Sequence, residues 1–178
     1  MKEGLRDDLK LKLEIAKRNS DSIQEVLKKG KAKVLALDVA THCGWAISKE
    51  VSGVWDLSPK RDESAGMRLI RFKAKLKTVI EAENVNIVVF EKSAGLHKSS
   101  IIVQSEFHGV LKLFLEEMNL PYRSFSATEI KKFATDKGNA NKTMMVEACR
   151  KNYSVEPVDD NHADALHILF FAKDHLNL

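Results

Sequence analysis

Four acidic side chains stand at positions where they could jointly bind divalent cations. Asp38 follows the apolar run 34–37, and Glu91 follows the strand-like run 86–90. Asp160 and Asp164 are four residues apart in a segment with helical patterning, which places both on one helix face. Carboxylate oxygens are the ligands that Mg²⁺ and Mn²⁺ prefer. We therefore predict that these four acids are the catalytic residues and hold two such ions for phosphodiester hydrolysis.

Taken singly, the acids have ordinary structural explanations. Asp38 could be a turn former, Glu91 could belong to a surface salt bridge, and Asp160 could cap a helix. Asp164 is different, because residues 163–169 are mostly apolar and a buried carboxylate among them needs a compensating partner. The order of strand end, strand end and helix face favours a metal site over four unrelated roles.

The fourth metal ligand is open among the residues that begin the last helix. Asp160 is the first choice, and Asp159, Asn161 and His162 are alternatives from the same segment. For His162, a solvent-facing ring without a ligand role is the ordinary expectation.

The elements that must position these acids alternate between strand and helix periodicity. Strand-like runs occupy 34–37, 44–47, 51–57, 86–90 and 122–125, and helical periodicity occupies 63–83, 101–118, 128–134, 142–151 and 161–175. We summarise the order over 33–178 as β-β-β-α-β-α-β-α-α, one α/β domain with a mixed sheet. Residues 1–32, which end near Gly30, predict an appended N-terminal helical arm, either one amphipathic helix or a helical pair.

Three segments resemble the motifs of RuvC-type Holliday junction resolvases. Segment 37–46 is similar to the opening motif, an apolar strand ending in Asp38, a Thr-containing turn, Gly44 and a second strand. Segment 88–91 resembles the second acidic strand, and 160–166 resembles the C-terminal signature with its Ala-Asp-Ala-Leu stretch. The resemblance covers 33–175 and implies an RNase H-like fold. Asn161 departs from the acid or His that the bacterial enzymes have at this position, and the order Asp159-Asp160-Asn161, in which Asp160 would take over, resembles phage-type relatives. The N-terminal arm has no counterpart.

The resemblance implies a structure-selective endodeoxyribonuclease that cleaves Holliday junctions or related branched DNA without a covalent enzyme intermediate. It also implies a symmetric homodimer, because a four-way junction offers two cleavage points related by a two-fold axis. The helix 101–118 is apolar over a wide arc, and its candidate interface residues are Ile102, Phe107, Gly109 and Val110. Burial within one subunit would produce the same pattern.

Lysines near the acids and in the segment 128–142 are candidates for contacts with DNA phosphates. Segment 128–142 resembles the Lys-bearing helix, Gly-containing turn and following Lys of the same family. Such contacts position nucleic acid without reading its sequence, although any one of these lysines could equally be a solvated surface residue. The candidates are Lys92, Lys98, Lys131, Lys132, Lys137 and Lys142.

Composition narrows the alternatives. A net charge of +4 favours polyanionic partners only weakly, and no apolar run approaches the roughly 20 residues that a membrane span requires. The N-terminus has no secretory signal pattern, so we expect a cytoplasmic protein of a bacterium or a phage-infected host. The alternatives are another RNase H-like nuclease, such as a hybrid nuclease or transposase, and a non-catalytic junction-binding protein. A sugar kinase or ATPase of the actin-like type would need a longer chain.

Overall fold

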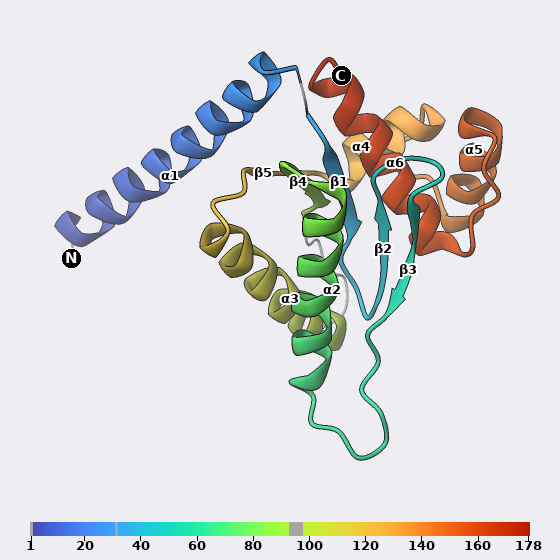
Figure 1. Cartoon of the computed structure of the whole chain (residues 1–178), viewed down its shortest axis with the longest axis horizontal. Coiled ribbons are helices and arrows are strands. Elements are labelled where there is room, and N and C mark those ends of the chain that lie inside the picture. The colour runs from blue at the N-terminus through green and yellow to red at the C-terminus, as the bar shows by residue number, and fades with distance from the viewer. Residues whose placement is uncertain (1, 31, 93–97) are drawn as a thin grey trace.

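A mixed five-stranded sheet lies at the centre of the computed structural model, which describes residues 2–30, 32–92 and 98–178. Its strand order is β3-β2-β1-β4-β5 (Figure 1). The first three strands form an antiparallel meander, and β4 and β5 continue the sheet parallel to β1. The strands are β1 (Val34–Asp38), β2 (His42–Ala46), β3 (Ser52–Asp56), β4 (Ile87–Glu91) and β5 (Tyr122–Phe125).

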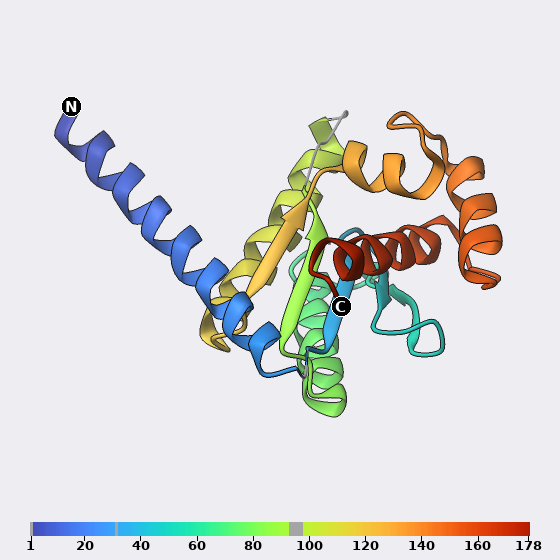
Figure 2. The same cartoon turned by 90° about the horizontal axis from the view of Figure 1, so that it is seen from above.

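Helices cover both faces of this sheet, as Figure 2 shows. One face packs against α2 (Met67–Glu83) and α3 (Lys98–Glu117), and the other against α6 (Asp160–His175), which α4 (Ala127–Thr135) and α5 (Lys142–Tyr153) flank. Successive side chains of a strand point to opposite faces. Leu35 and Leu37 of β1 therefore join the core beneath α2 and α3, whereas Val34 and Ala36 join the core beneath α6. Burial on both faces explains the continuously apolar sequences of β1 and β4.

The N-terminal segment is the single helix α1 (Lys2–Lys28), which projects away from the body (Figures 1 and 2). Its C-terminal half is attached to the edge of the sheet. Ile23 is buried, and the Asn19 amide makes two hydrogen bonds, of 2.7 and 2.9 Å, with the backbone of Tyr122 in β5. Gly30, with a φ of 65°, follows the helix, as its position in the sequence predicts. Of the two predicted forms of the arm, the structure has the single helix.

The predicted strands and helices all form, but the summary order counts one helix too few. Segments 128–134 and 142–151 belong to two separate helices, so three helices follow β5. Asp136 in the left-handed conformation and Asn141 as an N-cap separate α4 from α5. None of the helices in the described ranges combines the length and apolar composition needed to cross a bilayer.

Candidate active site

Asp38 and Glu91 end two neighbouring parallel strands at the same edge of the sheet. Leu37 of β1 pairs with Phe90 of β4, so the next residue of each strand is one of the two acids. Their even spacing from Ala36 and Val89 directs both side chains to the face that α6 covers. The alternation of the strands thus points both carboxylates toward α6.

The N-terminal part of α6 brings two more acids to this place. Asp159 is the N-cap of the helix, and its carboxylate accepts a 2.8 Å hydrogen bond from the backbone N–H of His162. Asp160 and Asp164 follow one helical turn apart. Because the first turn of a helix presents unpaired N–H groups, acids are favoured there.

Gly44 of β2 allows this helix to lie directly on the sheet. Gly44 pairs with Asp38, and a Cβ atom built on it would lie 1.9 Å from the backbone oxygen of Asn161 and 3.1 Å from the Cβ of Ala165. Any other residue would push the first turn of α6 outward. Gly44 is therefore required for the approach of Asp160 and Asp164 to Asp38. The sequence motif contains this glycine, but only the structure shows which backbone it faces.

The four acids form one electrostatic cluster. Burial raises the pKa of Asp38 well above its usual range, and the charges of Asp164, Glu91 and Asp160 raise it further. Burial and then the charges of Glu91 and Asp160 raise the pKa of Asp164 to about 7. Burial also raises the pKa of Glu91. With all four carboxyls ionised, the cluster would therefore hold more negative charge than its surroundings stabilise.

Two lysines border the cluster and offset part of its charge. Lys142, at the start of α5, forms an ion pair with Asp160, and this contact raises the pKa of the lysine. Lys131 of α4 lies close enough to Glu91 and Asp164 for its charge to offset part of the rise in the pKa of both carboxyls. Asp164 Oδ1 is nevertheless buried without a hydrogen-bond partner in the described part of the chain. A buried carboxylate oxygen in this state calls for a cation or a donor.

The arrangement fits a hard divalent cation in charge and in donor type, because it consists of desolvated carboxylate oxygens. Within residues 2–30, 32–92 and 98–178, no three Asp, Glu, His or Cys side chains converge on a single point as a formed metal site would. Asp160 is instead paired with Lys142. Binding of an ion would therefore require the carboxylates to turn toward a common centre.

The alternative ligands have other structural roles. The carboxylate of Asp159 caps α6 and accepts a 3.1 Å hydrogen bond from the Asn161 amide. His162 is buried, so the expectation of a solvent-facing ring is wrong. Its Nδ1 accepts from the backbone N–H of Val158 at 3.1 Å, and its Nε2 lies 2.9 Å from the hydroxyl of Ser52. With both ring nitrogens engaged, His162 fastens α6 to β3.

The predicted phosphate-binding lysines divide into two groups. Lys131 and Lys142 lie beside the acids, and Lys132 and Lys137 are exposed nearby on α4 and the turn after it. Lys92 follows Glu91, is exposed, and lines a different hollow beside β5. The side chain of Lys98 is outside the described part of the structure.

The four candidate interface residues of α3 do not share one environment. Phe107 is completely buried, 5.2 Å from the ring of Phe72, so its placement in a subunit interface is wrong. It belongs to the core between α3 and α2 because the helix faces the sheet on that side. Ile102 is 62% exposed, Gly109 is exposed, and Val110 is partly buried. Leu113, which the sequence reasoning did not single out, is 60% exposed on the same helix.

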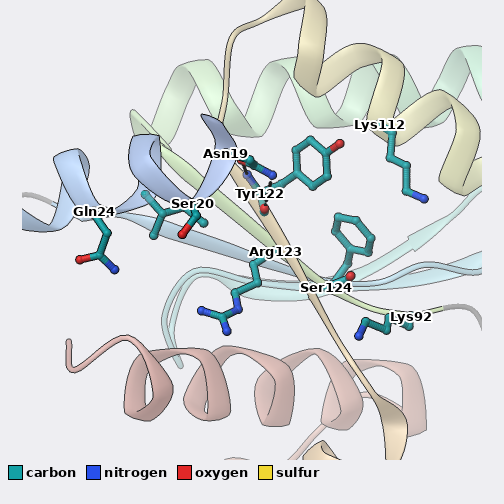
Figure 3. Close-up of a pocket in the computed structure, with 10 residues that line it drawn as sticks. Asn19, Ser20, Gln24, Lys92, Lys112, Tyr122, Arg123 and Ser124 are labelled. Carbon is teal, nitrogen blue, oxygen red and sulfur yellow. Dashed lines mark hydrogen bonds between the residues drawn. The ribbon is translucent and has the colours of Figure 1, made fainter. Parts of the chain in front are cut away.

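The structure also places two cations that sequence patterning did not indicate. Lys112 of α3 and Arg123 of β5 line the hollow beside Lys92 (Figure 3). They are isolated basic residues within otherwise apolar or polar elements, so no spacing rule distinguishes them from surface charges.

Single proteins of known sequence and solved structures match this chain consistently, although no family model matches the sequence. The chain is 30% identical over 103 residues to the crossover junction endodeoxyribonuclease RuvC of Synechococcus sp. strain WH7803, covering 57% of this chain and 67% of that protein. It is 29% identical over 116 residues to the RuvC of strain CC9311, covering 64% and 71%.

Two solved structures share the architecture. T. thermophilus RuvC in complex with a Holliday junction substrate superposes with a TM-score of 0.64 at 18% identity, over 79% of this chain and 92% of that one. The yeast mitochondrial Holliday junction resolvase Ydc2 gives a TM-score of 0.54 at 14% identity, over 82% and 80%. The predicted RNase H-like α/β fold with a mixed sheet is thereby confirmed.

Proposed function

The chain belongs to the RuvC family of crossover junction endodeoxyribonucleases, and from this membership we propose that it cleaves four-way or related branched DNA. The observation that carries the proposal is the acid cluster. Carboxylates from β1, β4 and α6 lie close enough at one edge of the sheet for their charges to raise the pKa of Asp38 and Asp164, and the charges of Lys131 and Lys142 oppose this rise. A surface that combines desolvated acids with flanking cations suits hydrolysis of a phosphodiester.

Asp38, Glu91, Asp160 and Asp164 would hold two Mg²⁺ or Mn²⁺ ions in this proposal. When bound, such ions activate the attacking water and stabilise the leaving oxygen. Asp38 is half-buried, so its charge is only partly solvated by water, and the unpartnered Oδ1 of Asp164 is available as a ligand for a cation. Asp38 and Asp164 would thus be the main ligands of the ions, and Asp160 would become a further ligand once its ion pair with Lys142 is broken.

Lys142 has a second role in the same scheme. It is bound to Asp160, yet 81% of its side chain is exposed. An approaching DNA phosphate can therefore replace Asp160 as its partner, which would free the carboxylate. Lys131, Lys132 and Lys137 extend the positive charge away from the acids and would hold the adjoining backbone without sequence preference.

Two copies of the chain are proposed to act together through the exposed apolar face of α3. Ile102 and Leu113 are exposed there, and a Cβ atom on Gly109 would meet nothing within 4 Å. Removing these apolar side chains from water would stabilise a contact between two α3 helices. A two-fold contact of this kind would give the homodimer that two symmetric cuts require. Ile102→Glu should yield monomers in sedimentation, whereas Ile70→Glu, equally 62% exposed on α2, should not. Two unchanged dimers would refute this interface.

The function is tested by cleavage of a synthetic four-way junction, with linear duplex, forked DNA and an RNA·DNA hybrid as controls. We expect divalent-ion-dependent cutting of the junction, loss of cutting in Asp38→Asn, and retained junction binding by that variant. Equal cutting of the hybrid would favour another RNase H-like nuclease. Binding without any cutting by the parent protein would favour a non-catalytic role, and turnover in EDTA would refute the metal mechanism.

A further inference from the structure

A basic groove runs around the edge strand β5, outside the acid cluster. Its main hollow, of about 610 Å³, lies between α1, β5 and α3. An adjoining hollow of about 390 Å³ extends it along α3 past Ser105 and His108 to Gly109, where it borders the proposed dimer face. The two hollows share Phe90, Lys92, Lys112 and Ser124. They therefore form one continuous depression, which we call the β5 groove.

The charged side chains that line the β5 groove are all cations. Lys92, Lys112 and Arg123 line it, and its described lining contains no Asp or Glu. None of these three cations forms an ion pair with a carboxylate within the described ranges, in contrast to Lys73, which pairs with Glu117 at 2.8 Å. Unpaired cations around a polar depression are a site for an anion.

The cations come from different sides of the strand. Arg123 pairs with Val89 in the ladder and so leaves β5 on the face toward α6, whereas Ser124 pairs with Phe90 and faces α3. Figure 3 shows Arg123 near the α1 side and Lys112 and Lys92 toward the other end. Because the cations lie on different sides of β5, an extended polyanion that crosses the strand edge suits them better than a single small anion.

Helix α1 supplies the opposite wall with uncharged polar side chains. Asn19, Ser20 and Gln24 line the main hollow, and the two hydrogen bonds of Asn19 to Tyr122 hold the helix in place. An ion pair between Arg18 and Glu116 of α3 adds a second attachment. The groove is therefore a fixed feature of the fold. Amide and hydroxyl groups can donate to phosphate oxygens as the cations do.

We propose that the β5 groove binds the sugar-phosphate backbone of one DNA arm as it leaves the acid cluster. Lys92 connects the two places, because it follows Glu91 directly and lines both hollows. The inference deepens the proposed function, on which it rests, by assigning Lys112 and Arg123 to phosphate contacts and α1 to the wall of a DNA channel.

The test measures binding of fluorescein-labelled four-way junction and linear duplex by anisotropy, in EDTA, over a series of salt concentrations. Each lost phosphate contact makes the negative slope of log K against log salt shallower by about one, and weakens binding by roughly tenfold at 0.1 M salt. Lys112→Gln and Arg123→Gln should each show this loss. The control is Lys49→Gln/Lys75→Gln, which removes two exposed charges outside the groove and should leave the slope unchanged.

Two substitutions of opposite charge at Gln24 of α1 test whether the groove binds an anion. Gln24 is exposed and lines the main hollow, so its replacement should not disturb the core. Gln24→Lys should tighten binding with a steeper salt dependence, and Gln24→Glu should weaken it. A merely structural role for the position would move both variants in one direction, which would overturn the proposal.

The two proposals fail in distinguishable ways. If the parent protein binds and cuts the junction but Lys112→Gln and Arg123→Gln match the control, the groove proposal is overturned and the function stands. If the two variants lose a phosphate contact on both substrates while the parent protein shows no preference for the junction, the groove stands and the proposed function fails.

Discussion

Replacing Asp164 by Asn should make the protein more stable in the absence of divalent cations while abolishing cleavage. The carboxylate is mostly buried, is repelled by Glu91 and Asp160, and has one oxygen without a partner. Its pKa is raised from 3.8 to about 7. Since one pKa unit equals about 1.36 kcal/mol, ionised Asp164 lowers the free energy of unfolding by roughly 4 kcal/mol at pH 8.

The pH dependence of this effect has a definite sign. Between pH 3.8 and about 7, folded Asp164 retains a proton that the unfolded chain has already released. The free energy of unfolding therefore falls as the pH rises through this window, and the full penalty is present above about pH 7. Asn does not titrate, so the advantage of Asp164→Asn should be small near pH 4 and largest above pH 7.

Thermal and urea unfolding in EDTA at pH 5 and pH 8 measure the difference. For a chain of this size, about 4 kcal/mol corresponds to a rise in Tm on the order of 10 °C at pH 8. Added Mg²⁺ should stabilise the parent protein more than Asp164→Asn, because the ion relieves a repulsion that the variant lacks. The exposed Asp174→Asn, near the end of the same helix, is the control and should change stability by less than about 0.5 kcal/mol. A variant that is no more stable at pH 8 than the parent, or equally stabilised at pH 5 and pH 8, would refute the reasoning.

Three further predictions follow from contacts outside the acid cluster. Gly44→Ala should lower the free energy of unfolding by several kcal/mol and abolish cleavage, because the new Cβ would overlap the Asn161 carbonyl. In the control Gly53→Ala the atom nearest to the new Cβ is 3.5 Å away, and equal losses of stability for the two variants in chemical denaturation would contradict the prediction. His167 is buried and hydrogen-bonded at both ring nitrogens, so its pKa should be below 6.5 when followed by NMR of the ring. The unfolded chain then takes up a proton first, and the free energy of unfolding should fall as the pH drops below 6.5; a normal titration would show that the ring is solvated. Asn19→Ala removes two hydrogen bonds, worth about 1 kcal/mol each, and should speed amide exchange in α1 but not in the central strands; unchanged exchange in α1 would mean that Asn19 does not attach it.

Composition and periodicity along the chain predict the strands, the helices and the acids that they carry. Apolar residues in β1 and β4 run without alternation because both faces of these strands are covered, and each run stops at an acid. The four-residue spacing of Asp160 and Asp164 sets them on one helix face whatever lies opposite. Both signals can be read from a short stretch of sequence, because they depend on its composition and on the period of the backbone and do not require knowing which element packs against it.

Packing between distant segments sets which of several possible partners each side chain has. An apolar arc on a helix has the same pattern whether it faces its own sheet or another subunit, and only packing against Phe72 assigned Phe107 to the core. Likewise His162 is buried because Ser52, 110 residues earlier in the chain, comes within 2.9 Å of it. Asn19 and Tyr122, 103 residues apart, are likewise brought together by packing, and both line the β5 groove. Such contacts depend on how the helices pack on the sheet. The pattern of residue types along the chain does not show which residue of a neighbouring element will lie opposite a given side chain.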